Sequence, residues 1–166
     1  MINMTYLTLA CIVSFVSAFL AFASIFLIFS GNLFLASLFL IICVVLDFLD
    51  GKVARWMNQA SNFGKEIDSL VDVLCFGVAP AFFLSSVLVF PWNFVPFLIV
   101  LGGIYRLARY NVENQSTHFK GMPITANGLI VPIFYLFSFL NLYTSIGLSV
   151  VLFVLMVSTL KIKKIL

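Results

Sequence analysis

Charged side chains are scarce in this sequence. Lys, Arg, Asp and Glu together make up 9% of the 166 residues, whereas 63% are hydrophobic. Soluble domains carry roughly 25% charged residues, so this chain has too few polar groups to cover a water-soluble fold. The net charge is only +3 and no long basic run is present, which argues against a nucleic-acid partner. We therefore expect a protein that lies in a lipid bilayer.

Histidine and cysteine are also rare. The single histidine, His118, lies in a predicted loop, and no Cys-His or Ser-His-Asp arrangement is available to form a covalent intermediate. Cys11, Cys43 and Cys75 are widely spaced within apolar segments, which indicates packing residues rather than a disulfide framework or a metal site. The first apolar segment lacks a basic region and a small-residue cleavage site, so we expect a membrane helix and not a removable signal.

Long apolar runs fill most of the chain, with short polar breaks between them. A membrane helix needs about 20 apolar residues, and the pattern predicts an all-α integral membrane protein of about six transmembrane helices in a single domain, 1–166. Pro80 is expected to kink or open the third helix, and Gly102 and Gly103 to allow close packing of the fourth. The predicted ranges are Tyr6–Phe29, Asn32–Trp56, Gly64–Leu88, Trp92–Asn111, Thr125–Leu140 and Ser145–Leu160.

With an even number of spans, the ends of the second, fourth and sixth helices face the same side of the membrane. All charged residues of the sequence fall on that side. The connections at 30–32, 91–93 and 141–144 carry no charge. Under the positive-inside rule the charged side is cytoplasmic and holds both termini. We expect a multi-pass protein of the cytoplasmic membrane whose site faces the cytoplasm.

Four aspartates close the second predicted helix and open the third. Residues three or four apart share a helix face, so each helix presents a pair, and an antiparallel hairpin brings the pairs to one membrane depth. Carboxylates are costly in a membrane and cannot all ionise together without a cation. Hard oxygen ligands suit Mg²⁺, Mn²⁺ or Ca²⁺, and the charge favours a pair of ions. The predicted metal ligands are Asp47, Asp50, Asp68 and Asp72.

Small residues flank these acids. Gly51, Ala54 and Gly64 leave an open shelf for a bulky ligand such as a nucleotide diphosphate, and Arg55 offers a planar fork for a phosphate or a base. The alternative is an interfacial salt-bridge network between the acids and the neighbouring cations. Because the acids and the small residues fall in register, the sequence favours a binding site.

The spacing Asp47-x2-Asp50-Gly51-x2-Ala54-Arg55-x8-Gly64-x3-Asp68-x3-Asp72 resembles the signature of the CDP-alcohol phosphatidyltransferases at every defined position. The resemblance implies a helical membrane enzyme, usually a homodimer, that transfers a phosphatidyl group from a CDP-linked lipid to an alcohol and releases CMP. It also implies that the aspartates bind metal and that Asp72 is the general base. The positions implied to bind CDP are Asp47, Gly51, Ala54, Arg55, Gly64 and Asp68.

A second region resembles the serine-using branch of that family, the phosphatidylserine synthases. It comprises two arginines three residues apart on one helix face and the segment Phe119–Pro123. The arginines are expected to hold the serine carboxylate or the lipid phosphate, and their alternative role is anchoring at the headgroups. Thr125 and Asn127 depart from the pattern of that branch. The expected acceptor-site residues are Arg106, Arg109, Lys120, Gly121, Pro123, Thr125 and Asn127.

The expected reaction is a direct displacement by the hydroxyl of L-serine on CDP-diacylglycerol or CDP-archaeol. A sister enzyme that uses glycerol phosphate or inositol phosphate would also employ basic residues in its acceptor pocket. A divalent-cation transporter belongs to a different class, and it is disfavoured because the acids lie toward one interface and no inverted repeat is present. A purely structural membrane subunit would leave the acids and glycines in register unexplained.

Overall fold

A computed structural model describes residues 9–56, 62–112, 118–158 and 161–163. Each of the six predicted ranges contains a helix, and the third continues from an α-helix through a π-helical turn into another α-helix. The elements are α1 (Leu9–Phe29), α2 (Leu33–Trp56), α3 (Asn62–Asp72), η2 (Val73–Val78), α4 (Ala79–Val87), η3 (Trp92–Phe94), α5 (Phe97–Val112), β1 (His118–Lys120), η4 (Ile124–Ala126), α6 (Asn127–Leu136), α7 (Leu142–Val157) and β2 (Lys161–Lys163).

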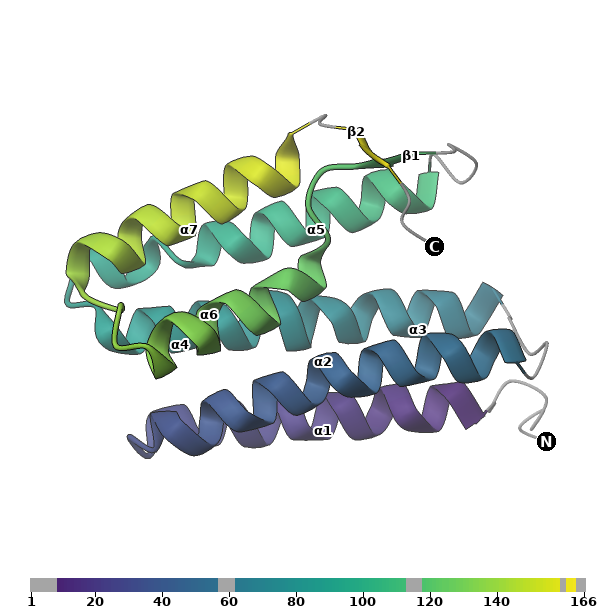
Figure 1. The fold of residues 1–166 in the computed structure, drawn as a ribbon, viewed down its shortest axis with the longest axis horizontal. Helices are drawn as coiled ribbons and strands as arrows, with labels where there is room; N and C mark the ends of the chain where they lie inside the picture. Colours follow the sequence, from purple (N-terminus) through teal and green to yellow (C-terminus); the bar gives the residue numbers. More distant parts are fainter. Residues whose placement is uncertain (1–8, 57–61, 113–117, 159–160, 164–166) are drawn as a thin grey trace.

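With α3, η2 and α4 counted as one continuous segment, successive helices run antiparallel in one elongated bundle (Figure 1). α1 and α2 form one edge, α5 and α7 form the opposite edge, and α3, α4 and α6 lie between them. The end of α2, the start of α3, the end of α5 and the β1–β2 ribbon all lie at the same end of the bundle. We call this the polar end, because the described charged residues of α2, α3 and α5 belong to the parts of these helices nearest to it. The uncharged connections from α1 to α2, α4 to α5 and α6 to α7 lie at the other end.

Three predicted boundaries were wrong in detail. α5 begins at Phe97, because Trp92–Phe94 forms a separate 3₁₀ turn and Pro96 immediately precedes the helix. α6 ends at Leu136, after which Ser138 adopts a positive φ of 57°. α7 already starts at Leu142, because the side chains of Asn141 and Thr144 form a reciprocal capping box.

The all-α prediction is confirmed for the fold, and the structure adds one short two-stranded ribbon. Residues His118–Lys120 pair antiparallel with Lys161–Lys163. This ribbon joins the segment before α6 to the segment after α7.

α1 is built with small residues inside and large aromatic residues outside. Its buried face is formed by Ser14, Ser17, Ala21, Ser24 and Ile28. Its exposed face carries Phe15, Phe19, Phe22, Phe26 and Phe29, each more than half exposed. Small side chains let α1 approach α2 closely, and the Ser24 hydroxyl donates to the Ala36 carbonyl at 3.0 Å. A continuous aromatic face of this kind suits lipid rather than water.

Two helical segments are long and apolar enough to cross a membrane. They are Cys11–Phe29, with a mean hydropathy of 2.6, and Phe63–Val87, with 2.0. Shorter apolar helices cover Leu33–Leu49, Ile124–Leu136 and Leu142–Val157. These lengths are compatible with the predicted bundle in a membrane, and the number of spans stays a prediction.

The expected opening of the third helix at Pro80 is confirmed. The π-helical turn η2 comes directly before α4, in which Pro80 lies in the first turn. Proline has no N–H, so the carbonyl of Phe76, four residues earlier, loses its ordinary helical donor. The side-chain amide of Asn127 replaces it, donating from Nδ2 to that carbonyl at 3.0 Å. α6 is therefore tied to the helix that carries the acids.

The prediction of close helix packing at the glycine pair is also confirmed. A Cβ at Gly102 would lie 3.0 Å from the Phe153 ring and 3.1 Å from the Met156 methyl of α7. A Cβ at Gly103 would collide with Ile124 of η4. These contacts fix α5 against α7 and η4, which positions the arginines of α5.

Candidate active site

Three of the four predicted acids meet in the structure. Asp47 comes from α2, and Asp68 and Asp72 come from successive turns of α3. One carboxylate oxygen from each lies within 4.8 Å of the other two. All three side chains are half-buried. The predicted convergence of the hairpin is thus confirmed for these residues.

The local sequence explains this convergence. The apolar residues of α2 up to Leu46 hold the helix against α1, so Asp47 is the first acid where the apolar run ends. The spacing of Asp68 and Asp72 puts both on one face of α3. Like charges this close repel one another, and oxygen ligands at this spacing suit a hard divalent cation. The cluster can therefore hold a metal ion.

The remaining members of the acidic motif are only partly described. Asp50, Gly51, Ala54 and Arg55 belong to the last turns of α2, but their side chains lie outside the described residues. Gly64 lies on α3 one turn before Asp68 and is half-buried. The position of Asp50 one turn after Asp47 agrees with the predicted pair, and its role as a fourth ligand stays a prediction.

Arg106 faces the acid cluster from α5. Only 9% of its surface is exposed, and its electrostatic partners include Asp72. Its Nε atom is buried and has no hydrogen-bond partner in the described part of the protein. A buried guanidinium donor without an acceptor is costly, and an anionic group bound beside the acids would satisfy it.

A second contact between α3 and α5 was not expected from the sequence. The Asn111 amide Nδ2 donates to the Ser69 hydroxyl at 3.4 Å, and that hydroxyl donates to the Lys65 carbonyl at 3.0 Å. One turn away, the Lys65 ammonium lies 5.5 Å from the centre of the Tyr110 ring. The only sequence signal was Ser69, a polar residue three positions before Asp72 on the same helix face. These contacts hold α3 and α5 in register beside the acids.

Arg109 has different surroundings from Arg106. Its guanidinium donates to the carbonyl of Val157 at 3.2 Å and to that of Ser158 at 3.1 Å. Gly121 packs against the Arg109 guanidinium and the end of α7. Its φ is +78°, and an added Cβ would lie 2.6 Å from the Met156 carbonyl oxygen. The N–H of Met122 donates to the Leu155 carbonyl at 3.1 Å. We call this arrangement of Arg109, Gly121, Met122 and the end of α7 the C-terminal clasp.

The other predicted acceptor residues are distributed along the segment before α6. Pro123 is exposed, Thr125 is half-buried, and Asn127 is fully buried with its Nδ2 atom bonded to Phe76. The Oδ1 atom of Asn127 is buried without a hydrogen-bond partner in the described ranges. The side chain of Lys120 lies outside the described residues. The contact of these residues with an acceptor stays a prediction.

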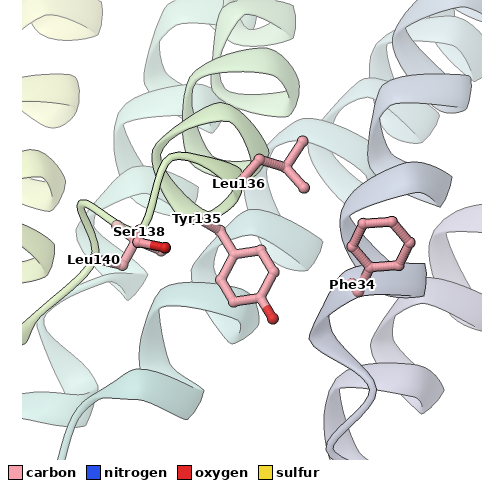
Figure 2. Close-up of a pocket in the computed structure, with 5 residues that line it drawn as sticks. All are labelled: Phe34, Tyr135, Leu136, Ser138 and Leu140. Atoms are coloured by element: carbon pink, nitrogen blue, oxygen red, sulfur yellow. The ribbon is translucent and has the colours of Figure 1, made fainter.

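A cavity of about 420 Å³ lies at the opposite end of the bundle from the acids. Figure 2 shows Tyr135 and Leu136 of α6 on one side and Phe34 of α2 on the other, with Ser138 and Leu140 from the turn that follows α6. None of these residues carries a charge. The cavity is therefore separate from the acid cluster.

This chain is similar to known proteins over nearly its whole length. Residues 4–160 match the family described as CDP-alcohol phosphatidyltransferase. The archaetidylserine synthase of Methanothermobacter thermautotrophicus is 34% identical over 164 residues, covering 95% of this chain and 70% of that protein. A CDP-diacylglycerol--serine O-phosphatidyltransferase of Helicobacter pylori strain J99 is 38% identical over 161 residues, covering 87% of this chain and 67% of that protein.

A Bacillus subtilis protein that is also named CDP-diacylglycerol--serine O-phosphatidyltransferase is 37% identical over 107 residues, covering 61% of this chain and 60% of that protein. The match to the family extends over nearly all of the described residues, including α2 and α3 with the three clustered aspartates. These relatives are transferases, and the family is membrane-bound. This chain belongs to the CDP-alcohol phosphatidyltransferase family.

Proposed function

We propose that this protein transfers a phosphatidyl group from a CDP-linked lipid to the hydroxyl of L-serine and releases CMP. The observation that carries the proposal is the cluster of Asp47, Asp68 and Asp72 with the buried Arg106 beside it. The names of the relatives, which specify serine or archaetidylserine, support serine as the acceptor. The lipid donor is CDP-diacylglycerol or its ether-linked archaeal counterpart, CDP-archaeol.

The reaction is a displacement at the lipid-side phosphorus of the diphosphate. The serine oxygen forms a bond to this phosphorus while the bond to the oxygen of CMP breaks. An alcohol is a weak nucleophile until a base takes its proton, and a carboxylate oxygen of Asp72 is the proposed acceptor of that proton. Asp72 suits this role because it is the acid that also interacts with Arg106, on the side where an acceptor can bind.

The acid cluster is the proposed site of Mg²⁺ or Mn²⁺, held by Asp47, Asp68 and Asp72 together with Asp50, as a pair of ions. When bound, the metal supplies charge neutralisation for the diphosphate and for the leaving phosphate. The protein contributes a fixed geometry, because two acids lie on one helix face and the third lies on the adjacent helix. Gly51, Ala54, Arg55 and Gly64 are the proposed lining of the CDP pocket, on the cytoplasmic side of the acids.

Arg106 is the proposed partner of the serine carboxylate. A planar guanidinium binds a carboxylate through two parallel hydrogen bonds, and the Nε atom of Arg106 is a free donor among the described residues. Binding the carboxylate there would place the serine hydroxyl toward Asp72. The Oδ1 atom of Asn127 is also buried and unsatisfied, and it is a second candidate contact for the amino group.

The proposed setting is the cytoplasmic membrane, crossed by six helices in a single domain, with the polar end and both termini in the cytoplasm. The phenylalanine face of α1 supports a lipid environment. The grouping of Asp47, Asp68 and Asp72 with Arg106 supports one water-accessible face for CDP and serine. A homodimer, as is usual in this family, is part of the proposal.

CMP release by the purified protein tests the proposal. The protein in detergent or in vesicles is given CDP-diacylglycerol and Mg²⁺ or Mn²⁺, with serine, glycerol phosphate and inositol phosphate offered in parallel. We expect CMP release and a new phospholipid with serine only. Release only with a phosphorylated alcohol would keep the acid site and refute the serine assignment.

Two further measurements separate the remaining alternatives. A transporter would be favoured if no acceptor supported CMP release and if divalent cations entered sealed vesicles that contain the protein but no CDP-lipid. CDP-archaeol in place of CDP-diacylglycerol distinguishes an ether-linked donor from an ester-linked one. The ratio of the two kcat/KM values gives the preferred lipid class.

A further inference from the structure

The first turn of α6 lies against both helical segments that lead to the acid cluster. A Cβ at Gly128 would lie 2.6 Å from the Phe76 ring of η2 and 2.7 Å from the Val44 side chain of α2. Phe76 comes four residues after Asp72. Val44 comes three residues before Asp47, so both contacts lie about one helical turn from an acid. α6 therefore packs tightly on α2 and η2 next to the cluster.

Asn127, directly before Gly128, makes a polar contact at the same place. Its side chain is fully buried, and its Nδ2 atom donates to the Phe76 carbonyl at 3.0 Å and to the Met156 Sδ atom at 3.5 Å. Pro80 leaves the Phe76 carbonyl without its helical donor. A buried carbonyl without a hydrogen bond is costly, so the amide of Asn127 stabilises the backbone of η2 in its present form.

The π-helical turn η2 sets how α3 is rotated relative to α4. At its end the N–H of Ala79 donates to the carbonyl of Leu74, five residues earlier. A π-helical turn holds one residue more than an α-helical turn, and one residue corresponds to a rotation of about 100° about the helix axis. Asp72 immediately precedes η2, and α4 is anchored in the core through Phe83 and Leu84. A change in this turn would therefore rotate the acids of α3 relative to the core.

We propose that Asn127 is a positioning residue for the acid cluster. Its hydrogen bond to the Phe76 carbonyl preserves the π-helical turn, and this turn keeps Asp68 and Asp72 directed toward Asp47. This role rests on the proposed function of the cluster as a metal site, and it differs from a contact between Asn127 and the serine amino group. Without the amide the buried carbonyl is left unpaired, which favours a rearrangement of η2 that separates the acids.

Asn127→Leu tests the proposal, because leucine is similar in size and has no donor. The readouts are the Kd for Mn²⁺, from the electron paramagnetic resonance signal of free Mn²⁺, and kcat for CMP release. We expect the Kd for Mn²⁺ to rise about tenfold, the order of effect of one hydrogen bond, and kcat to fall while the KM for serine changes little. Binding of Mn²⁺ requires no acceptor, so failure of the serine assignment leaves this readout intact.

Pro80→Ala supplies a second variant, because it gives the Phe76 carbonyl a possible helical donor, the N–H of residue 80. The bond from Ala79 to Leu74 does not use that N–H, so the π-helical turn can remain. We expect the double variant, Asn127→Leu with Pro80→Ala, to bind Mn²⁺ and to release CMP as Pro80→Ala alone does. This comparison does not require the single variant Asn127→Leu to fold.

Ser24→Ala is the matched control. It removes another bond from a buried side chain to a backbone carbonyl, that of Ala36 at 3.0 Å, between α1 and α2. We expect it to lower Tm without changing the Kd for Mn²⁺ or kcat.

Three results overturn the proposal. An equal loss of Mn²⁺ affinity from Asn127→Leu with and without Pro80→Ala would show that the Phe76 carbonyl is not involved. A higher KM for serine with an unchanged Kd for Mn²⁺ would favour direct contact of Asn127 with the acceptor. A lower Tm with unchanged Kd and kcat, as expected for Ser24→Ala, would leave Asn127 with a purely structural role. Absence of Mn²⁺ binding by the unaltered protein is a separate result, which would refute the metal site on which the role of Asn127 rests.

Discussion

The acid cluster and the C-terminal clasp each contain an arginine from α5, but the two arginines have different partners. Arg106 is buried beside Asp72 and its Nε atom has no hydrogen-bond partner in the described part of the chain. Arg109, three residues later, donates to two carbonyls at the end of α7. The first arginine has an unused donor near a group of acids, whereas the second is engaged in holding backbone.

We infer from this difference that Arg106 serves ligand binding and that Arg109 serves the stability of the fold. An unsatisfied buried donor destabilises the free protein, and a ligand that satisfies it gains affinity from the same group. Bonds to the last carbonyls of a helix instead replace donors that the helix itself cannot supply. We therefore expect substitutions in the acid cluster to change kinetics, and substitutions in the clasp to change stability.

The largest effect is expected at the centre of the acid cluster. Asp72→Asn removes the proposed base with little change of shape, and general-base catalysis contributes about 10²–10⁴-fold to a rate. We expect kcat for CMP release to fall by that factor at saturating Mg²⁺ and serine. The matched control is Glu66→Gln, which neutralises an exposed acid on the same helix. Equal activity in both variants would remove Asp72 from the mechanism.

The variant Arg106→Gln tests whether this arginine binds the serine carboxylate. Hydrogen bonds to a charged group contribute roughly 1.5–3 kcal/mol, which corresponds to a rise of about 10- to 150-fold in the KM for serine. The KM for the CDP-lipid should stay nearly constant. The measurement is CMP release at varied serine and at varied CDP-lipid. A parallel rise of both KM values would instead assign Arg106 to the lipid phosphate.

Helical periodicity was sufficient to predict the six helical segments and the meeting of Asp47 with Asp68 and Asp72. These predictions depend on short-range geometry: apolar runs form helices, and acids at a spacing of four share a face. The residues of the capping box, Asn141 and Thr144, are visible in the sequence, but the predicted connection at 141–144 includes both of them. The start of α7 was misplaced for that reason.

Contacts between distant segments could not be predicted in the same way. The pairing of His118–Lys120 with Lys161–Lys163 and the bonds of Arg109 to α7 each join residues that no local spacing relates. The amide of Asn127 is an intermediate case. Pro80 predicts that the carbonyl of Phe76 lacks its helical donor, but only the fold shows that Asn127 supplies the replacement.

The clasp is tested first at its tightest point. Gly121→Ala introduces a Cβ at a φ of +78°, where it would meet the Met156 carbonyl at 2.6 Å. A left-handed backbone costs a residue with a side chain about 1–2 kcal/mol, before any clash is counted. We expect a lower Tm in detergent micelles with an unchanged KM for serine. Gly147→Ala is the control, since a Cβ at Gly147 has no atom within 4 Å.

The smallest effect, and the one that decides the comparison, is expected for Arg109→Gln. Loss of its bonds to Val157 and Ser158 should lower the free energy of unfolding by about 0.5–1.5 kcal/mol, because other partners and water can serve those carbonyls in part. The KM for serine should be that of the unaltered protein, since the guanidinium is committed to α7. Thermal unfolding and serine kinetics on the same preparation give both quantities. If the KM rises as far as in Arg106→Gln while Tm is unchanged, both arginines serve the acceptor, and the division of α5 into a catalytic and a scaffolding arginine is wrong.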